Sequence, residues 1–171
     1  MTGAGALQVR GRAWVFGDQI DTDLLAPGPF LRKPLPELAT HCLQAVAPDF
    51  ASSVRPGDIV VGGIGFGIGS SREQAVQALA QLGVAAVLAR GFARIFYRNA
   101  LNLGLPAMQC EAFQIESGDQ IELDLVAGAV HNLSRGQHWD CDPLPPPLIE
   151  LLQAGGLMPW LARRQPGAPA A

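Results

Sequence analysis

Apolar and polar positions along this chain follow an alternating order of strands and helices. Three apolar runs predict strands, the second and third of them buried: residues 12–16, 56–63 and 84–89. Between the second and third runs, apolar side chains recur at helical spacing: Ala75, Ala78, Leu79 and Leu82. Gly83 is placed to end this helix. A second helix over 92–103 and a strand over 106–110 complete an order that favours a parallel sheet with right-handed crossovers.

The pattern changes in the second half of the chain. Short alternating runs over 117–133, interrupted by turn residues, predict β-hairpins added to the parallel core. A proline-initiated helix is expected within 143–157, and apolar spacing predicts a short helix over 36–46. We therefore predict an α/β fold with a small, mostly parallel core sheet. We expect residues 1–162 to form one domain and residues 163–171 a flexible tail.

The composition is that of an ordinary globular protein and excludes several classes. The 171 residues carry a net charge of −3, and no basic run points to nucleic acid. The N-terminus has no apolar signal core, and no stretch approaches the roughly 18 apolar residues of a membrane helix. We therefore expect a cytoplasmic protein with neither a nucleic-acid nor a membrane partner.

The three cysteines, Cys42, Cys110 and Cys141, are far apart in the sequence and form no CxxC pair. Because their number is odd, a disulfide framework is not expected. Their spacing also offers no zinc or iron–sulfur cage, so no metal site is predicted in this chain.

Candidate chemistry is concentrated in a glycine-rich loop, "GGIGFGIG", over 62–69, which Ser70, Ser71 and Arg72 follow. Such a loop before a helix lets backbone N–H groups approach an anion, and Arg72 adds a bidentate donor for a carboxylate or phosphate. The spacing of Ser70 and Glu73 also fits a capping box, so Ser70 is either a helix cap or part of a ligand site. Neither a P-loop lysine nor a G-x-G-x-x-G pattern is present, which excludes both nucleotide signatures.

Three motifs in chain order resemble the aconitase superfamily. "GFGIGSSREQA" is similar to its glycine–serine–serine–arginine–glutamate signature, "GDQIDTDLLAP" over 17–27 to its threonine–aspartate motif, and residues 91–108 to its downstream helix and strand. The length and the "LLQAGGL" ending resemble the small-subunit family of 3-isopropylmalate dehydratases. The resemblance covers most of residues 10–160 and implies a swivelling β/β/α domain of the aconitase C-terminal type.

The resemblance implies a hydro-lyase that isomerises a hydroxy-diacid, with 3-isopropylmalate and 2-isopropylmalate of leucine biosynthesis as the expected pair. It implies a large partner subunit that carries a [4Fe–4S] cluster and no cofactor in this chain. By position in the motifs, Ser70 is the catalytic base and Asp23 orients it, whereas Ser71 and Arg72 bind a substrate carboxylate. A serine is a weak base, so the helix N-terminus and backbone N–H groups are needed to stabilise its alkoxide.

Two other functions stay open. The same chemistry could act on methylmalate, dimethylmalate or homoaconitate, or the chain could be a non-catalytic anion-binding or scaffold module with the same fold. A large subunit with three cluster cysteines would favour a hydro-lyase. Asp18 and Asp21 raise a metal-site hypothesis, but loop aspartates usually cap helices and turns.

Overall fold

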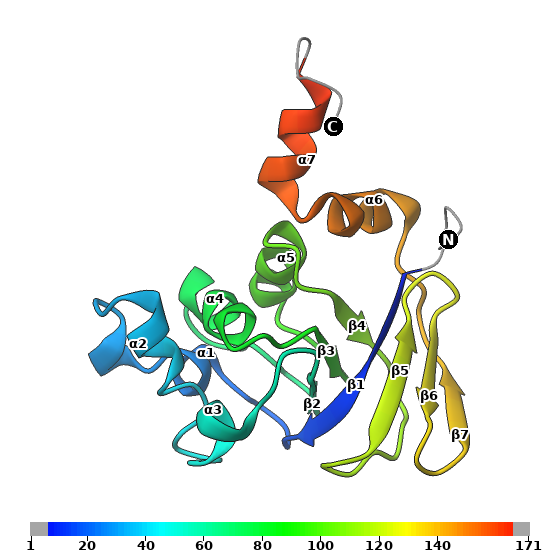
Figure 1. Ribbon diagram of the computed structural model, residues 1–171, viewed down its shortest axis with the longest axis horizontal. Helices are drawn as coiled ribbons and strands as arrows, with labels where there is room; N and C mark the ends of the chain where they lie inside the picture. The colour runs from blue at the N-terminus through cyan, green and yellow to red at the C-terminus, as the bar shows by residue number, and fades with distance from the viewer. Residues whose placement is uncertain (1–6, 166–171) are drawn as a thin grey trace.

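The computed structural model describes residues 7–165 and is built on a mixed seven-stranded sheet with the order β4-β3-β2-β1-β5-β6-β7. Its strands are β1 (Gln8–Val15), β2 (Ile59–Gly62), β3 (Ala86–Ala89), β4 (Ala107–Gln109), β5 (Gln120–Asp124), β6 (Ala129–Asn132) and β7 (Gln137–Asp140). Strands β1 to β4 pair in parallel, and β5 to β7 continue the sheet antiparallel from the other side of β1. The sheet curls between these halves (Figure 1). The predicted α/β class, parallel core and added hairpins are confirmed.

Helices α4 (Glu73–Gln81) and α5 (Arg94–Asn102) form the two crossovers of the parallel half, as predicted. Gly83 follows α4 with a φ of +83°, and Gly104 follows α5 with a φ of +79°, so each helix ends at a left-handed glycine. Both helices pack on one face of the sheet (Figure 1). Both therefore begin at the same edge of the sheet, where β2 and β3 end.

Alternate residues of the central strands enter two separate cores. Val60 and Val87 face the core beneath α4 and α5, whereas Ile59, Val61 and Leu88 face a second core. The second core lies between the curled sheet and helix α6 (Pro146–Ala154). Burial on both faces explains why β2 and β3 are continuously apolar.

Strand β1 is longer than the predicted 12–16 because it pairs on both sides. Its first half pairs antiparallel with β5, from Gln8 opposite Asp124 to Arg12 opposite Gln120. Its second half pairs in parallel with β2, and Trp14 lies opposite Val60. The first half alternates exposed and half-buried residues, a pattern that local apolar runs do not reveal.

The predicted helix over 36–46 is wrong in length. Helix α2 spans Leu35–Ala39 only, and a series of turns replaces the rest. Leu43 adopts a left-handed φ of +59° and its N–H donates to the carbonyl of Leu24 at 2.8 Å. This long-range hydrogen bond and the burial of Leu43 outweigh the local helical spacing.

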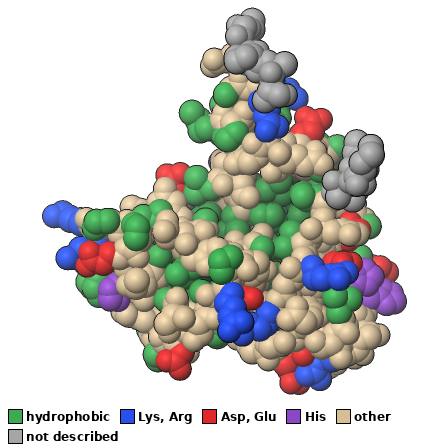
Figure 2. Space-filling model, in the orientation of Figure 1, with side chains coloured by type: hydrophobic (Ala, Val, Ile, Leu, Met, Phe, Trp, Pro, Cys, Tyr) green, Lys and Arg blue, Asp and Glu red, His purple; other side chains and the backbone are tan. Residues whose placement is uncertain are grey.

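Several short elements were not predicted. They are α1 (Thr22–Leu25), the 3-10 helix η1 (Gly28–Phe30), α3 (Phe50–Ser53) and α7 (Leu157–Arg164). The predicted proline-initiated helix is α6, which ends at Gly155 with a φ of +93°. Helix α7 follows it, projects from the body, and carries hydrophobic side chains on its surface (Figures 1 and 2). It includes Arg163 and Arg164 of the predicted tail, and residues 166–171 of that tail lie outside the described residues.

A disulfide joins Cys110 to Cys141, so the expectation that the cysteines form no disulfide is wrong for this pair. Cys110 follows β4 and Cys141 follows β7, which are the two edge strands of the sheet. Curling of the sheet brings these edges together, although 31 positions separate the two residues. The remaining cysteine, Cys42, is buried in the core beneath α4, and burial raises the pKa of its thiol to about 12.

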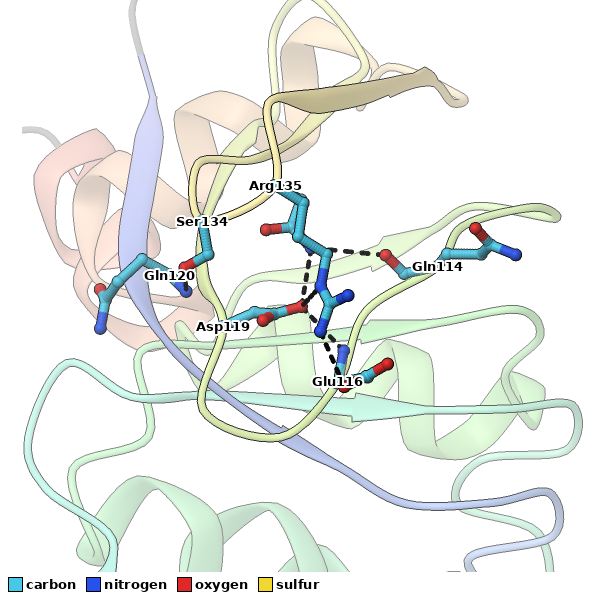
Figure 3. A network of polar contacts seen from close by, with 7 residues as sticks. Gln114, Glu116, Asp119, Gln120, Ser134 and Arg135 are labelled. Atoms are coloured by element: carbon cyan, nitrogen blue, oxygen red, sulfur yellow. Dashed lines mark hydrogen bonds and ion pairs between the residues drawn. The ribbon is translucent and has the colours of Figure 1, made fainter.

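A polar network joins the loop before β5 to the end of β6 and the turn that follows it (Figure 3). The carboxylate of Asp119 accepts hydrogen bonds from Asn132 at 2.8 Å and from Arg135 at 2.9 Å. Arg135 also forms an ion pair with Glu116 at 2.7 Å. Within residues 7–165, no helix is both long and apolar enough to span a bilayer.

Candidate active site

The three motifs of the sequence meet at the edge of the sheet where β1, β2 and β3 end. The segment 17–22 and the glycine loop run side by side and exchange backbone hydrogen bonds. Gln19 donates to Ile64 at 2.7 Å, and Thr22 donates to Ile68 at 2.9 Å. Gly67 donates back to the carbonyl of Ile20 at 2.7 Å. The glycine loop is therefore fixed along much of its length.

Phe66 anchors the same loop from the other side. Its ring is 1% exposed and packs edge-on against Phe92 and Phe96, with centroids 5.9 and 5.2 Å away. Its N–H donates to the carbonyl of Gly91 at 2.9 Å, and its carbonyl accepts from Ala93 at 2.9 Å. The segment 91–96 thus holds the loop as an extra strand would. Sequence reasoning missed this anchor, which a lone phenylalanine between two glycines could have signalled.

Several glycines of the loop make room for protein atoms rather than for a ligand. A Cβ on Gly62 would overlap with the Phe66 ring, and a Cβ on Gly67 would overlap with Phe96. The expectation that these glycines serve close approach of an anion therefore needs correction at these positions. Their role is to let the loop pack tightly against Phe66 and Phe96.

Ser70 is not the cap of helix α4, so the capping-box alternative is wrong and the ligand site stays a prediction. The N-cap is Arg72, and no side chain caps the helix. Ser70 and Ser71 lie outside the helix and are exposed. Among residues 7–165, no group forms a hydrogen bond with either hydroxyl. Both hydroxyls are free to contact a ligand, and the N–H groups of the first turn of α4 lack a side-chain acceptor.

Arg72 contacts Asp23, the residue of the threonine–aspartate motif. Its Nη1 donates to Asp23 Oδ1 at 2.8 Å and to the carbonyl of Ala26 at 3.0 Å. The side chain of Arg72 is 21% exposed, so packing restricts where its guanidinium can point. Within the described part of the chain, Nε and Nη2 have no acceptor, and these two atoms form the edge that binds a carboxylate bidentately.

Asp23 lies in the site but contacts the arginine rather than the serine. The hydrogen bond from Arg72 is the main cause that lowers the pKa of the Asp23 carboxyl, and a 3.2 Å hydrogen bond from the N–H of Gly28 adds to it. Asp23 is thus held as a carboxylate that orients Arg72. Asp18 and Asp21 do the local work expected of loop aspartates: Asp18 accepts from Ile64 N–H at 2.8 Å, and Asp21 caps α1.

A hollow of about 240 Å³ lies beside these residues. Its lining residues come from two walls, the glycine loop with Thr22 and the start of α5: Thr22, Gly67, Ile68, Gly69, Ser70, Arg72, Ala93, Arg94, Ile95, Phe96 and Asn99. This volume is below the roughly 300–1,000 Å³ of pockets for drug-sized ligands, so the hollow suits a small metabolite. Ser70 and Arg72 both line this hollow.

The chain's own residues do not fit an iron–sulfur cluster. Cysteine thiolates ligate such clusters, but Cys42 is enclosed in the core and Cys110 is bonded to Cys141. In the described residues, His, Cys, Asp and Glu nowhere gather in a group of three that could hold a metal ion. The side chains of the hollow that can form hydrogen bonds are those of Thr22, Ser70, Arg72, Arg94 and Asn99.

Comparisons with known proteins show the family of this chain. Residues 45–112 match the family model of the aconitase C-terminal domain. The chain is 48% identical to 3-isopropylmalate dehydratase small subunit 1 of Methanopyrus kandleri, over 94% of this chain and 96% of that protein. It is 47% identical to the methanogen homoaconitase small subunit of Methanothermobacter thermautotrophicus, over 88% of each. Its fold matches the crystal structure of a 3-isopropylmalate dehydratase from Methanocaldococcus jannaschii with a TM-score of 0.87 and 42% identity, covering 92% and 95% of the two chains.

Proposed function

Because the chain belongs to the family of aconitase C-terminal domains that includes the small subunits of 3-isopropylmalate dehydratases, we propose that it is the small subunit of such a hydro-lyase. Its substrate in this proposal is 3-isopropylmalate, and its pathway is the cytoplasmic synthesis of leucine. The observation that carries the proposal is the hollow shared by the Ser70 hydroxyl and the Arg72 guanidinium. A hydroxy-diacid offers both groups a partner.

Arg72 orients the substrate in this mechanism. The free edge of its guanidinium, Nε and Nη2, accommodates one carboxylate bidentately, while Asp23 and the Ala26 carbonyl hold Nη1. Asp23 is accordingly a positioning residue, because it acts through Arg72. Ser71 is exposed but does not line the hollow, so its contact with the substrate carboxylate rests on the motif alone.

Ser70 moves the proton. With the carboxylate held by Arg72, Ser70 Oγ takes the proton from the adjacent carbon and returns it when water is added back. The uncapped first turn of α4 stabilises negative charge on this oxygen. The hydroxyl leaves from the neighbouring carbon, where a [4Fe–4S] cluster on the large subunit would supply the Lewis acid. In this chain Cys42 is buried and Cys110 is bonded to Cys141.

Reconstitution with the large subunit tests the function. The pair is expected to interconvert 3-isopropylmalate and 2-isopropylmalate, and this chain alone is expected to show no turnover. The homoaconitase relative favours a second candidate substrate, so homoaconitate and methylmalate belong in the same panel. Preference for either would change the substrate assigned to the enzyme but not the type of reaction. Absence of turnover with every diacid would favour the scaffold function.

Ser70→Asn separates the catalytic role from a structural one. Asparagine cannot take up the proton, so kcat of the pair should fall by about 100-fold or more. The unfolding free energy should change by less than about 0.5 kcal/mol, because Ser70 is exposed and caps nothing. Ser53→Ala, an exposed serine of α3, is the matched control and should leave both quantities unchanged. Near-normal turnover by Ser70→Asn would show that Ser70 is not the base.

A further inference from the structure

Arg94 lies in the second wall of the hollow that Ser70 and Arg72 share. It is the first residue of α5 and is exposed. The two walls come from different segments, so Arg72 and Arg94 reach the same hollow from separate elements. Arg94 belongs to the motif "GFARIFYRN", but an arginine at the start of a helix looks like any surface arginine in the sequence, and the sequence did not single it out.

The charges around the hollow are unbalanced without a ligand. Arg72 and Arg94 are the charged residues of its lining, and Arg72 is already paired with Asp23. In the described part of the chain, no carboxylate, carbonyl or aromatic ring contacts the guanidinium of Arg94. Arg94 also lines a neighbouring hollow with Asp142, and no ion pair joins the two in the described residues. Since the Arg72–Asp23 pair carries no net charge, Arg94 gives the lining of the first hollow its net positive charge.

The backbone adds to this positive character. Ala93 is the N-cap of α5 and offers no side-chain acceptor to the first turn of the helix. Ala93, Arg94 and Ile95 all line the hollow. Helix α5 has nine residues, so its N-terminal end carries a partial positive charge that complements an anion held by Arg94.

We propose that Arg94 binds the second carboxylate of the hydroxy-diacid, while Arg72 binds the first. The inference rests on the proposed function, because it takes the substrate to be a dicarboxylate. Two arginines from two walls of one hollow match a ligand with two carboxylates. Arg94 is thus a specificity-determining residue that monoacids do not use.

The test compares Arg94→Gln with Arg98→Gln in the reconstituted pair. Arg98 is exposed on the same helix but does not line the hollow, so it controls for loss of one positive charge on α5. For 3-isopropylmalate, Arg94→Gln should raise KM by at least 10-fold, and Arg98→Gln should stay within 2-fold of wild type. The KM of Arg94→Lys should lie between those of wild type and Arg94→Gln, because an ammonium keeps the charge but cannot bind bidentately. Melting temperatures of all three variants should match that of wild type.

A second readout distinguishes substrate binding from other roles of Arg94. The inhibition constant of a hydroxy-monoacid that lacks the second carboxylate should be the same for wild type and Arg94→Gln. An unchanged KM with weaker association of the two subunits would overturn the inference and assign Arg94 to the subunit contact. If Arg94→Gln bound the diacid and the monoacid more weakly by the same factor, the inference would also be overturned. If the wild-type pair turns over no diacid, the proposed function itself fails, and this inference fails with it.

Discussion

Replacement of Gly67 by alanine tests whether the glycine loop is a packed element of the fold. Gly67 has a φ of +82°, and a Cβ built on it would overlap with Cβ and Cγ of Phe96. Phe96 is only 2% exposed and packs against Phe66, so it has no free space to move into. The added methyl group must therefore displace the loop, the phenylalanine or both.

The expected loss has two independent parts. An L-residue in the left-handed region costs roughly 1–2 kcal/mol. Forcing one extra methyl group into a packed core costs roughly 1–3 kcal/mol more. We therefore expect Gly67→Ala to lower the unfolding free energy by about 2–5 kcal/mol, a large part of the roughly 5–15 kcal/mol typical of a domain.

Urea unfolding measures this loss, and Gly17→Ala is the matched control. Gly17 lies beside the same loop, but no atom lies within 4 Å of a Cβ built on it. Its replacement should cost less than about 0.5 kcal/mol. A loss below about 1 kcal/mol in Gly67→Ala, or an equal loss in both variants, would refute the reasoning and return the glycines to a role in ligand approach.

Two further predictions concern stability. Reduction of the Cys110–Cys141 bond, which closes a loop of 31 positions, should lower the unfolding free energy by about 3–4 kcal/mol and the melting temperature by roughly 10 °C in a thermal scan. The unreduced, denatured chain should titrate one thiol, and three would contradict the pairing. Burial alone would raise the pKa of Asp58, but hydrogen bonds from Arg12, a backbone N–H and Trp14 lower it. Its stabilising contribution should thus be complete above the unfolded-state carboxyl pKa of about 3.9 and be lost as pH falls through the lowered folded value. Urea midpoints from pH 6 to 3 should show a smaller decline in Asp58→Asn than in wild type.

Local pattern predicts the parallel half of the fold well because each of its elements is decided by nearby residues. Strands β2 and β3 are buried on both faces and hence continuously apolar, and α4 carries one apolar stripe that a glycine ends. The resemblance to a known family then brings the motifs around Asp23, Ser70 and Arg72 together. The structure places all three residues at one edge of the sheet, which spacing alone does not establish.

What the sequence could not show depends on contacts between distant positions. Leu43 leaves the predicted helix because the carbonyl of Leu24 accepts its N–H. Cys110 and Cys141 meet only because the sheet curls until its edge strands approach each other. Arg94 acquires its significance from the hollow opposite Arg72 and not from its neighbours in the chain. In each case the relevant partner lies on another element, where periodicity and spacing carry no information.

The packed glycine loop bears directly on how a serine can serve as a base. A mobile loop would have to be ordered at each turnover, and the entropy of that ordering would oppose catalysis. Here the hydrogen bonds to Gln19, Ile20 and Thr22 and the anchor of Phe66 order the loop when the chain folds. Ser70 follows this ordered segment by two residues and lines the same hollow as Arg72 without a bound substrate. Binding energy of the diacid is then not used to order the loop and can stabilise the transition state. Electrostatic stabilisation of an alkoxide on the serine requires such preorganised groups.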